Sequence, residues 1–118
     1  MTLEIKNARI KSTMLGMEDH GIFTAFLYVE GDNWACGFGG YGMDAYAKHL
    51  NKRIGHRFGI DFIKGVLETL DVLTWEKLSG TFLRVETEGL GGKIKRVGHP
   101  IKEKWFDPDE LAEQMKDF

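Results

Sequence analysis

The side chains that could carry out acid–base or metal chemistry are few and scattered along this chain. Glu18, Asp19 and His20 are consecutive and are followed by Gly21. A carboxylate beside a histidine can transfer protons or bind a metal ion, whereas the glycine favours a polar turn whose side chains hydrogen-bond their own backbone. The histidines at positions 49, 56 and 99 lack familiar ligand spacing. We therefore favour the turn and expect no metal site.

Cys36 is the single cysteine, so an internal disulfide is excluded. A thiol nucleophile needs a neighbour that lowers its pKa, and the sequence around Cys36 offers none. With no nucleophile and base brought together by any motif, we predict no catalytic residues and no cofactor. This favours a binding protein over an enzyme.

The most unusual segment is residues 34–42, where glycines alternate with aromatic side chains. Its candidate contact residues are Trp34, Phe38, Gly39, Gly40 and Tyr41. One interpretation is a loop whose backbone N–H groups bind an anion while an aromatic ring stacks on a base. The other is a bent strand packed inside the protein. Three of the glycines match G-x-G-x-x-G, but the hairpin-like surroundings exclude a dinucleotide-binding βαβ unit.

A basic segment follows directly, with Lys48, Lys52, Arg53 and Arg57 accompanied by His56. Arg and Lys pair well with phosphate oxygens, so this segment and the glycines could hold a nucleotide or nucleic acid. The alternative is a solvated helix face. Two interpretations are open for four large aromatic residues, which could cover the edge of the core or anchor a protein interface. They are Trp34, Tyr46, Trp75 and Trp105.

Size and composition predict a single domain over residues 1–118. The hydrophobic fraction is 42% and the net charge is −2, so only a local patch could attract nucleic acid or a membrane. The N-terminus alternates charged and apolar residues, unlike a signal peptide. The longest apolar run, residues 22–29, is far shorter than the ~20 residues that span a bilayer. We predict a cytoplasmic protein that does not enter a membrane.

The pattern along the chain predicts an α+β fold: a bent antiparallel sheet of about five strands in two hairpins, with one main helix packed on it and a short C-terminal helix. Strands are expected at 3–16, with a bulge or bend near Asn7, at 22–29, 34–42, 81–87 and 93–97. Turns at 30–33 and 88–92 close the hairpins. A short helix is expected within 44–56 and the main helix at 59–70. Its apolar stripe is Ile60, Ile63, Leu67 and Leu70, widened by Phe62 and Val66. Asp107 and Pro108 begin the last helix.

The chain resembles a family of small proteins encoded by bacteriophages and prophages. The resemblance is carried by residues 5–13, 18–22, 37–41 and 75–80, including the motifs Glu-Asp-His-Gly and Gly-Phe-Gly-Gly-Tyr. It implies a phage accessory setting in the host cytoplasm, in which small proteins block a host factor or sequester a signalling molecule. No site residue is implied by it.

The sequence thus leads to three hypotheses. The first is a non-enzymatic phage protein that binds a host factor and inhibits it, in an anti-defence role. The second is a nucleotide-binding protein, either a sponge for a signalling nucleotide or a weak phosphodiesterase. The third is a single-stranded nucleic acid binder, which the acidic net charge disfavours. Exposed edge strands would also leave room for a homodimer.

Overall fold

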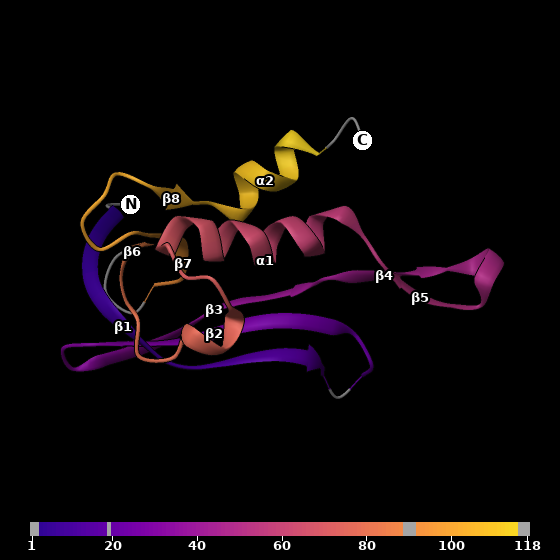
Figure 1. The fold of residues 1–118 in the computed structure, drawn as a ribbon, viewed down its shortest axis with the longest axis horizontal. Helices are drawn as coiled ribbons and strands as arrows, with labels where there is room; N and C mark the ends of the chain where they lie inside the picture. The colour runs from indigo at the N-terminus through magenta and orange to yellow at the C-terminus, as the bar shows by residue number, and fades with distance from the viewer. Residues whose placement is uncertain (1–2, 19, 89–91, 116–118) are drawn as a thin grey trace.

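The computed structural model describes residues 3–18, 20–88 and 92–115. A curled antiparallel sheet forms the body of the molecule (Figure 1), with the strand order β3-β2-β1-β6-β7-β8. These strands are β1 (Leu3–Met17), β2 (Phe23–Gly31), β3 (Trp34–Gly42), β6 (Phe82–Glu88), β7 (Ile94–Gly98) and β8 (Trp105–Phe106). The predicted α+β class with a bent antiparallel sheet is confirmed.

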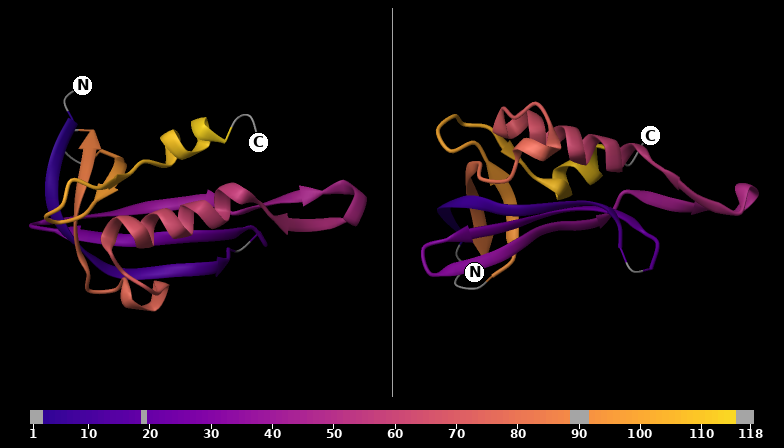
Figure 2. Two further views of the ribbon diagram at one scale, coloured as in Figure 1. Left: turned by 45° about the horizontal axis from the view of Figure 1, so that its top comes forward. Right: turned by 60° about the horizontal axis from the view of Figure 1, so that its bottom comes forward.

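The other elements are two helices, two short 3₁₀ turns and a separate two-stranded ribbon. Their bounds are β4 (Asp44–Ala47), η1 (Lys48–Leu50), β5 (Lys52–Gly55), α1 (Arg57–Leu70), η2 (Trp75–Lys77) and α2 (Pro108–Gln114). The main helix α1 lies along the sheet. The second helix, α2, lies beside α1, on the side away from strands β1 and β2 (Figures 1 and 2).

Strand β1 bends and pairs with two neighbouring strands. Its first half pairs with β6, from Leu3 opposite Glu88 to Arg9 opposite Phe82, and its second half pairs with β2. The register shifts between Ile10 and Ser12. The irregularity in the pairing of β1 thus lies after Ile10, because the pairing with β6 is regular from Leu3 to Arg9 and contains no bulge at Asn7. The parity of apolar residues changes before that point because the N-terminal apolar side chains of β1 are exposed, not because the strand is interrupted.

The core lies between the sheet and α1. Phe62 and Val66 of α1 are fully buried, and the Phe62 ring lies 5.8 Å from Phe38 of β3 and 5.2 Å from Phe106 of β8. Leu27 of β2 is opposite Phe38 and is also fully buried. Residues 22–29 thus supply the central strand that their apolar pattern predicted.

Both predicted hairpins are present. The β2–β3 turn consists of Asp32 and Asn33, and Asn33 takes the left-handed conformation with a φ of 63°, which asparagine tolerates better than most residues. Strands β6 and β7 pair as expected, although residues 89–91 of their predicted turn lie outside the described residues. At the C-terminus, Asp107 caps α2 by accepting hydrogen bonds from the N–H groups of Asp109 and Glu110.

The helix expected within residues 44–56 is wrong. These residues form the β4–β5 ribbon, in which Ala45 lies opposite Ile54 and Tyr46 lies opposite Arg53. Asn51 reverses the chain in a left-handed conformation with a φ of 52°. The ribbon continues the line of β3 and projects from the end of the molecule (Figures 1 and 2). We call residues 44–55 the arm.

Candidate functional site: a basic projecting arm

The glycine–aromatic segment is an ordinary part of the sheet, and its rings point in different directions. Phe38 is buried at 2% exposure and contacts Phe62 and Phe106, so its faces are occupied. Tyr41 is half-buried against Phe58 and Phe62, and burial raises the pKa of its hydroxyl. Internal packing therefore accounts for both rings.

The glycines of β3 are explained by close approach of β2. A Cβ on Gly37 would lie 2.1 Å from the Phe26 ring, and one on Gly39 would lie 2.5 Å from the backbone oxygen of Ala25. Gly39 and Gly40 also have positive φ angles, 109° and 82°. The segment matches the bent, internally packed strand that was the alternative to an anion-binding loop.

The predicted contact residues separate into two groups. Trp34 begins β3 at the β2–β3 turn, half-buried, with the Lys6 ammonium 5.3 Å from its ring centre. Lys48, Lys52 and Arg53 lie in the arm, beyond the other end of β3. Nine residues of strand span about 26 Å, so Trp34 and the arm do not form one surface.

The base of the arm is fixed to the body by Asp44. Its carboxylate accepts hydrogen bonds from the Arg53 guanidinium at 3.0 Å and from the Phe23 backbone N–H at 3.3 Å. Arg53 also donates to the Asp44 backbone oxygen at 2.9 Å. The hydrogen bond from Arg53 lowers the pKa of Asp44, which favours the carboxylate form of that side chain. Arg53 is therefore a support of the arm as well as part of its surface.

The outer part of the arm is cationic. Lys48, His49 and Lys52 are exposed, and Arg57 follows at the start of α1, where it pairs with Asp61 at 3.2 Å. Residues 44–57 contain four Lys or Arg and one carboxylate, in a chain whose net charge is −2. Positive charge is thus concentrated in this projection.

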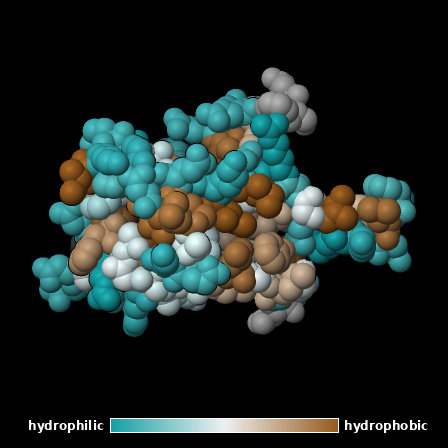
Figure 3. Space-filling view, in the orientation of Figure 1, coloured by the Kyte–Doolittle hydropathy of each residue, from teal (hydrophilic) through white to brown (hydrophobic). Residues whose placement is uncertain are grey.

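The arm also exposes apolar side chains. Tyr46 is 56% exposed, Leu50 49% and Ile54 39%. In Figure 3 the arm extends to the right of the molecule and carries both hydrophobic and hydrophilic surface. An isolated two-stranded hairpin is marginally stable in water, and burial of these side chains against another molecule would be favourable. Leu50 and Ile54 were not among the predicted contact residues.

The remaining sequence candidates have structural roles. Glu18 accepts a hydrogen bond from the His20 backbone N–H at 2.7 Å, which is the polar turn that we favoured; Asp19 lies outside the described residues. Trp75 is buried, and Trp105 is half-buried with Arg84 and Arg96 over its ring, 4.8 and 4.3 Å from its centre. Within residues 3–18, 20–88 and 92–115, no group of three potential metal ligands occurs.

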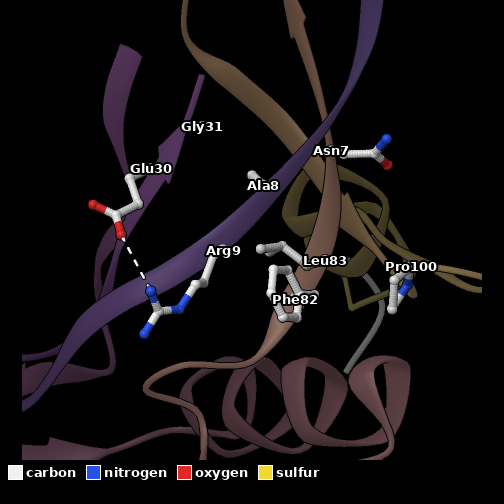
Figure 4. A pocket seen from close by; sticks show the side chains of 8 residues that line it. All are labelled: Asn7, Ala8, Arg9, Glu30, Gly31, Phe82, Leu83 and Pro100. Carbon is white, nitrogen blue, oxygen red and sulfur yellow. Dashed lines mark ion pairs between the residues drawn. The ribbon is translucent and has the colours of Figure 1, made fainter. Parts of the chain in front are cut away.

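A separate hollow of about 510 Å³ opens where β1 passes between β2 and β6 (Figure 4). Phe82, 64% exposed, and Arg9 stand beside each other on its wall, and Arg9 lies 3.8 Å from the Glu30 carboxylate. Asn7 and Pro100 contribute to the opposite side. None of these residues was predicted, because only the β1–β6 pairing brings positions 7–9 and 82 together.

Comparison with models of protein families, with curated proteins and with solved structures found no match to this chain. Among the described residues, neither helix has the length and apolar character needed to cross a membrane.

Proposed function

We propose that this chain is a non-enzymatic binding protein whose arm docks on a partner protein and blocks it. The observation that supports the proposal is the arm itself, which combines exposed Tyr46, Leu50 and Ile54 with exposed Lys48 and Lys52 on an anchored projection. A two-stranded projection of this kind has no hydrophobic core of its own in which these side chains could be buried. Its apolar side chains would be buried only by a second molecule.

The chemistry of the arm defines the partner. Leu50 at the tip fits an apolar recess, and Lys48 and Lys52 beside it fit an acidic rim. Tyrosine is enriched among the few interface residues whose truncation costs about 2 kcal/mol or more. Tyr46 exposes such a ring on the arm. Rim charges mainly accelerate association, so binding should become slower as salt increases.

The resemblance to bacteriophage and prophage proteins gives this binding its setting. We propose that the partner is a host protein in the bacterial cytoplasm and that the outcome is inhibition, in an anti-defence role. An arm inserted into a recess suits inhibition because it fills the space that a substrate or subunit would occupy.

Site-directed photocrosslinking tests this proposal. A photoreactive phenylalanine analogue placed at Leu50 should crosslink one host protein, whereas the same analogue at Ile101, which is 85% exposed on another loop, should not. The purified partner should then lose at least tenfold in affinity with Leu50→Asp. Equal crosslinking from both positions, or unchanged affinity, would refute the arm as the contact.

A nucleotide is the second candidate, and the hollow beside Phe82 favours it. Its volume suits a small ligand, with Phe82 to stack on a base and Arg9 to contact a phosphate. The predicted phosphate residues on the arm are not part of this hollow. Thermal unfolding with a panel of nucleotides tests it, since a ligand at a hundred times its Kd adds about 2.7 kcal/mol. A shift that Phe82→Ala abolishes would support this function, and its absence would reject it.

The third hypothesis, binding of single-stranded nucleic acid, would use the cations of the arm together with Tyr46. It predicts an affinity that falls steeply with salt. Binding of an oligonucleotide that survives Lys48→Glu would rule it out.

A further inference from the structure

The two edges of the six-stranded sheet differ in how they are protected. One edge is β8, which has two residues, and the other is β3, which has nine. Proteins usually protect an exposed edge with a short strand, a charged residue or a proline, because its unpaired N–H and C=O groups can pair with another strand. Residues 34–42 contain no charged residue and no proline. The β3 edge therefore lacks these protections.

The pairing of β2 with β3 determines which backbone groups point out of this edge. Trp34 pairs with Gly31 across a two-residue turn, so these two residues exchange hydrogen bonds. Since the direction of the backbone groups alternates along a strand, the outward groups within residues 34–38 are those of Ala35 and Gly37. Among the described residues, no backbone group bonds to them on that side. Ala35 is exposed and Gly37 is half-buried.

The large side chains of this part of β3 turn away from the edge. The Trp34 ring lies over Gly31, where an added Cβ would be 2.1 Å from it, and the Phe38 ring contacts α1 and β8. The small Cys36 side chain is the one beside the edge, since its half-buried thiol lies 3.5 Å from the outward-pointing oxygen of Gly37. Another extended chain can therefore approach without displacing a large side chain.

A second β3 fits this edge in one register. The regular segment, residues 34–38, lies between the turn and Gly39, whose φ of 109° is outside the strand region, and Cys36 is its centre. In an antiparallel pair centred on Cys36, Ala35 of each copy exchanges two hydrogen bonds with Gly37 of the other. The segment is uncharged, so no like charges meet. A shift by two residues would bring Gly39 or the turn into the ladder.

We propose that two copies of this chain form a two-fold symmetric dimer by antiparallel pairing of their β3 strands, with Cys36 of one copy facing Cys36 of the other. An extended backbone is what satisfies alternating N–H and C=O groups, and a second copy presents the same row in matching register. The pairing ends at two copies, because the other sheet edge, β8, has two residues. This goes beyond the proposed function, since it uses the sheet edge and not the arm. Because the arm continues the line of β3, the dimer carries its arms at opposite ends.

Sedimentation equilibrium in reducing buffer tests the dimer and should give the wild type twice the 13.4 kDa mass of the chain. Ala35→Pro removes an outward N–H group and should weaken the dimer at least tenfold. Ala35→Thr keeps that N–H group and should dimerise like the wild type. Circular dichroism confirms that each variant is folded. A wild-type mass of one chain at all concentrations overturns the proposal, as does an Ala35→Pro dimer as tight as that of the wild type.

Oxidative crosslinking tests the register on the wild-type protein, without a change at the edge. Facing residues of this pair type have Cα atoms about 4.5 Å apart, which a disulfide can bridge. Copper–phenanthroline should therefore oxidise the two Cys36 thiols to a disulfide and give a covalent dimer. Moving the thiol by Cys36→Ser with Ala35→Cys should abolish the crosslink, because those Cα atoms would lie about 8–9 Å apart.

No crosslink in the wild type, or equal crosslinking of the shifted thiol, overturns the proposal. The arm can still bind its partner in either case. Photocrosslinking from Leu50 therefore tests the proposed function separately.

Discussion

Replacing Gly59 by alanine should destabilise the protein, although alanine is the better helix former. Gly59 is buried in the first turn of α1, where an added Cβ would lie 2.4 Å from the Met43 backbone oxygen and 2.9 Å from its Cα. Helix propensity favours alanine by at most about 1 kcal/mol. Overpacking costs about 1–3 kcal/mol, and the upper end applies because backbone atoms cannot rotate away. We expect a net loss of about 2 kcal/mol in the free energy of unfolding.

Urea unfolding followed by circular dichroism measures this change, and the melting temperature should fall by about 8 °C for a domain of this size. Gly55→Ala is the matched control at the end of the arm, where an added Cβ meets no atom within 4 Å. It should be neutral or stabilise by up to about 1 kcal/mol. If Gly59→Ala stabilised the protein as much as the control, the close contact between α1 and the base of the arm would be refuted.

Three further predictions concern the core, a helix cap and a charged loop. Phe38→Ala should lower the free energy of unfolding in urea by about 4 kcal/mol. Leu50→Ala should change it by less than about 0.5 kcal/mol and weaken only partner binding. Equal losses of stability in the two variants would contradict the different burial of the two side chains. Asp107→Ala should cost about 2 kcal/mol, since it removes the cap of α2 and the partner of Lys95, 2.6 Å away; a loss under about 0.5 kcal/mol would argue against the cap. Hydrogen bonds from Lys102 and Lys104 lower the pKa of Asp71 from 3.8 to about 2, so its stabilisation is complete above pH 3.8 and is lost as the pH falls through 2. In thermal unfolding Asp71→Asn should therefore be less stable than the wild type at pH 7, and the difference should shrink as the pH falls toward 2. A difference at pH 2 as large as that at pH 7 would be inconsistent with this.

The elements with strong local signals were predictable from the sequence. The apolar run at 22–29, the two-residue turn after it and the Asp107–Pro108 helix start each depend on neighbouring residues, and all are present. The main helix was also predicted, and three residues of its predicted stripe, Phe62, Val66 and Leu70, are buried. Ile60 falls at helical spacing and yet is exposed, because the position of α1 over the sheet, which decides which flank is covered, is a tertiary property.

The arm was missed because its residues satisfy two patterns at once. Ala45, Leu50 and Ile54 fall near helical spacing, and no residue between them is a helix breaker. The structure follows a different signal, in which Asn51 takes a left-handed turn and Asp44 binds Arg53 across the ribbon. Asn51 is the one residue whose type suits that turn. Predicting the arm from the sequence would have required knowing that β3 continues straight into β4.

The predicted surface failed to form for a related reason. Phe38 and Leu50 are both large apolar residues within one glycine-rich and basic stretch, yet Phe38 is buried and Leu50 is exposed. Only the pairing of Phe38 with Leu27 in the sheet distinguishes them. Sequence reasoning located the basic segment, whereas the separation of Trp34 from it by the length of β3 required the structure.

The double role of β1 has a consequence for how this chain folds. Its C-terminal half pairs with β2 through a short turn, which can close within microseconds. Its N-terminal half cannot pair until β6 is present, because Leu3 pairs with Glu88, which lies 85 positions further along the chain. Loop closure grows costlier by about 0.6 kcal/mol with each doubling of length, and non-local strand pairing slows folding. The β1–β2–β3 meander should thus form first, and the arrival of β6 on the bent strand should be the late step that encloses the core.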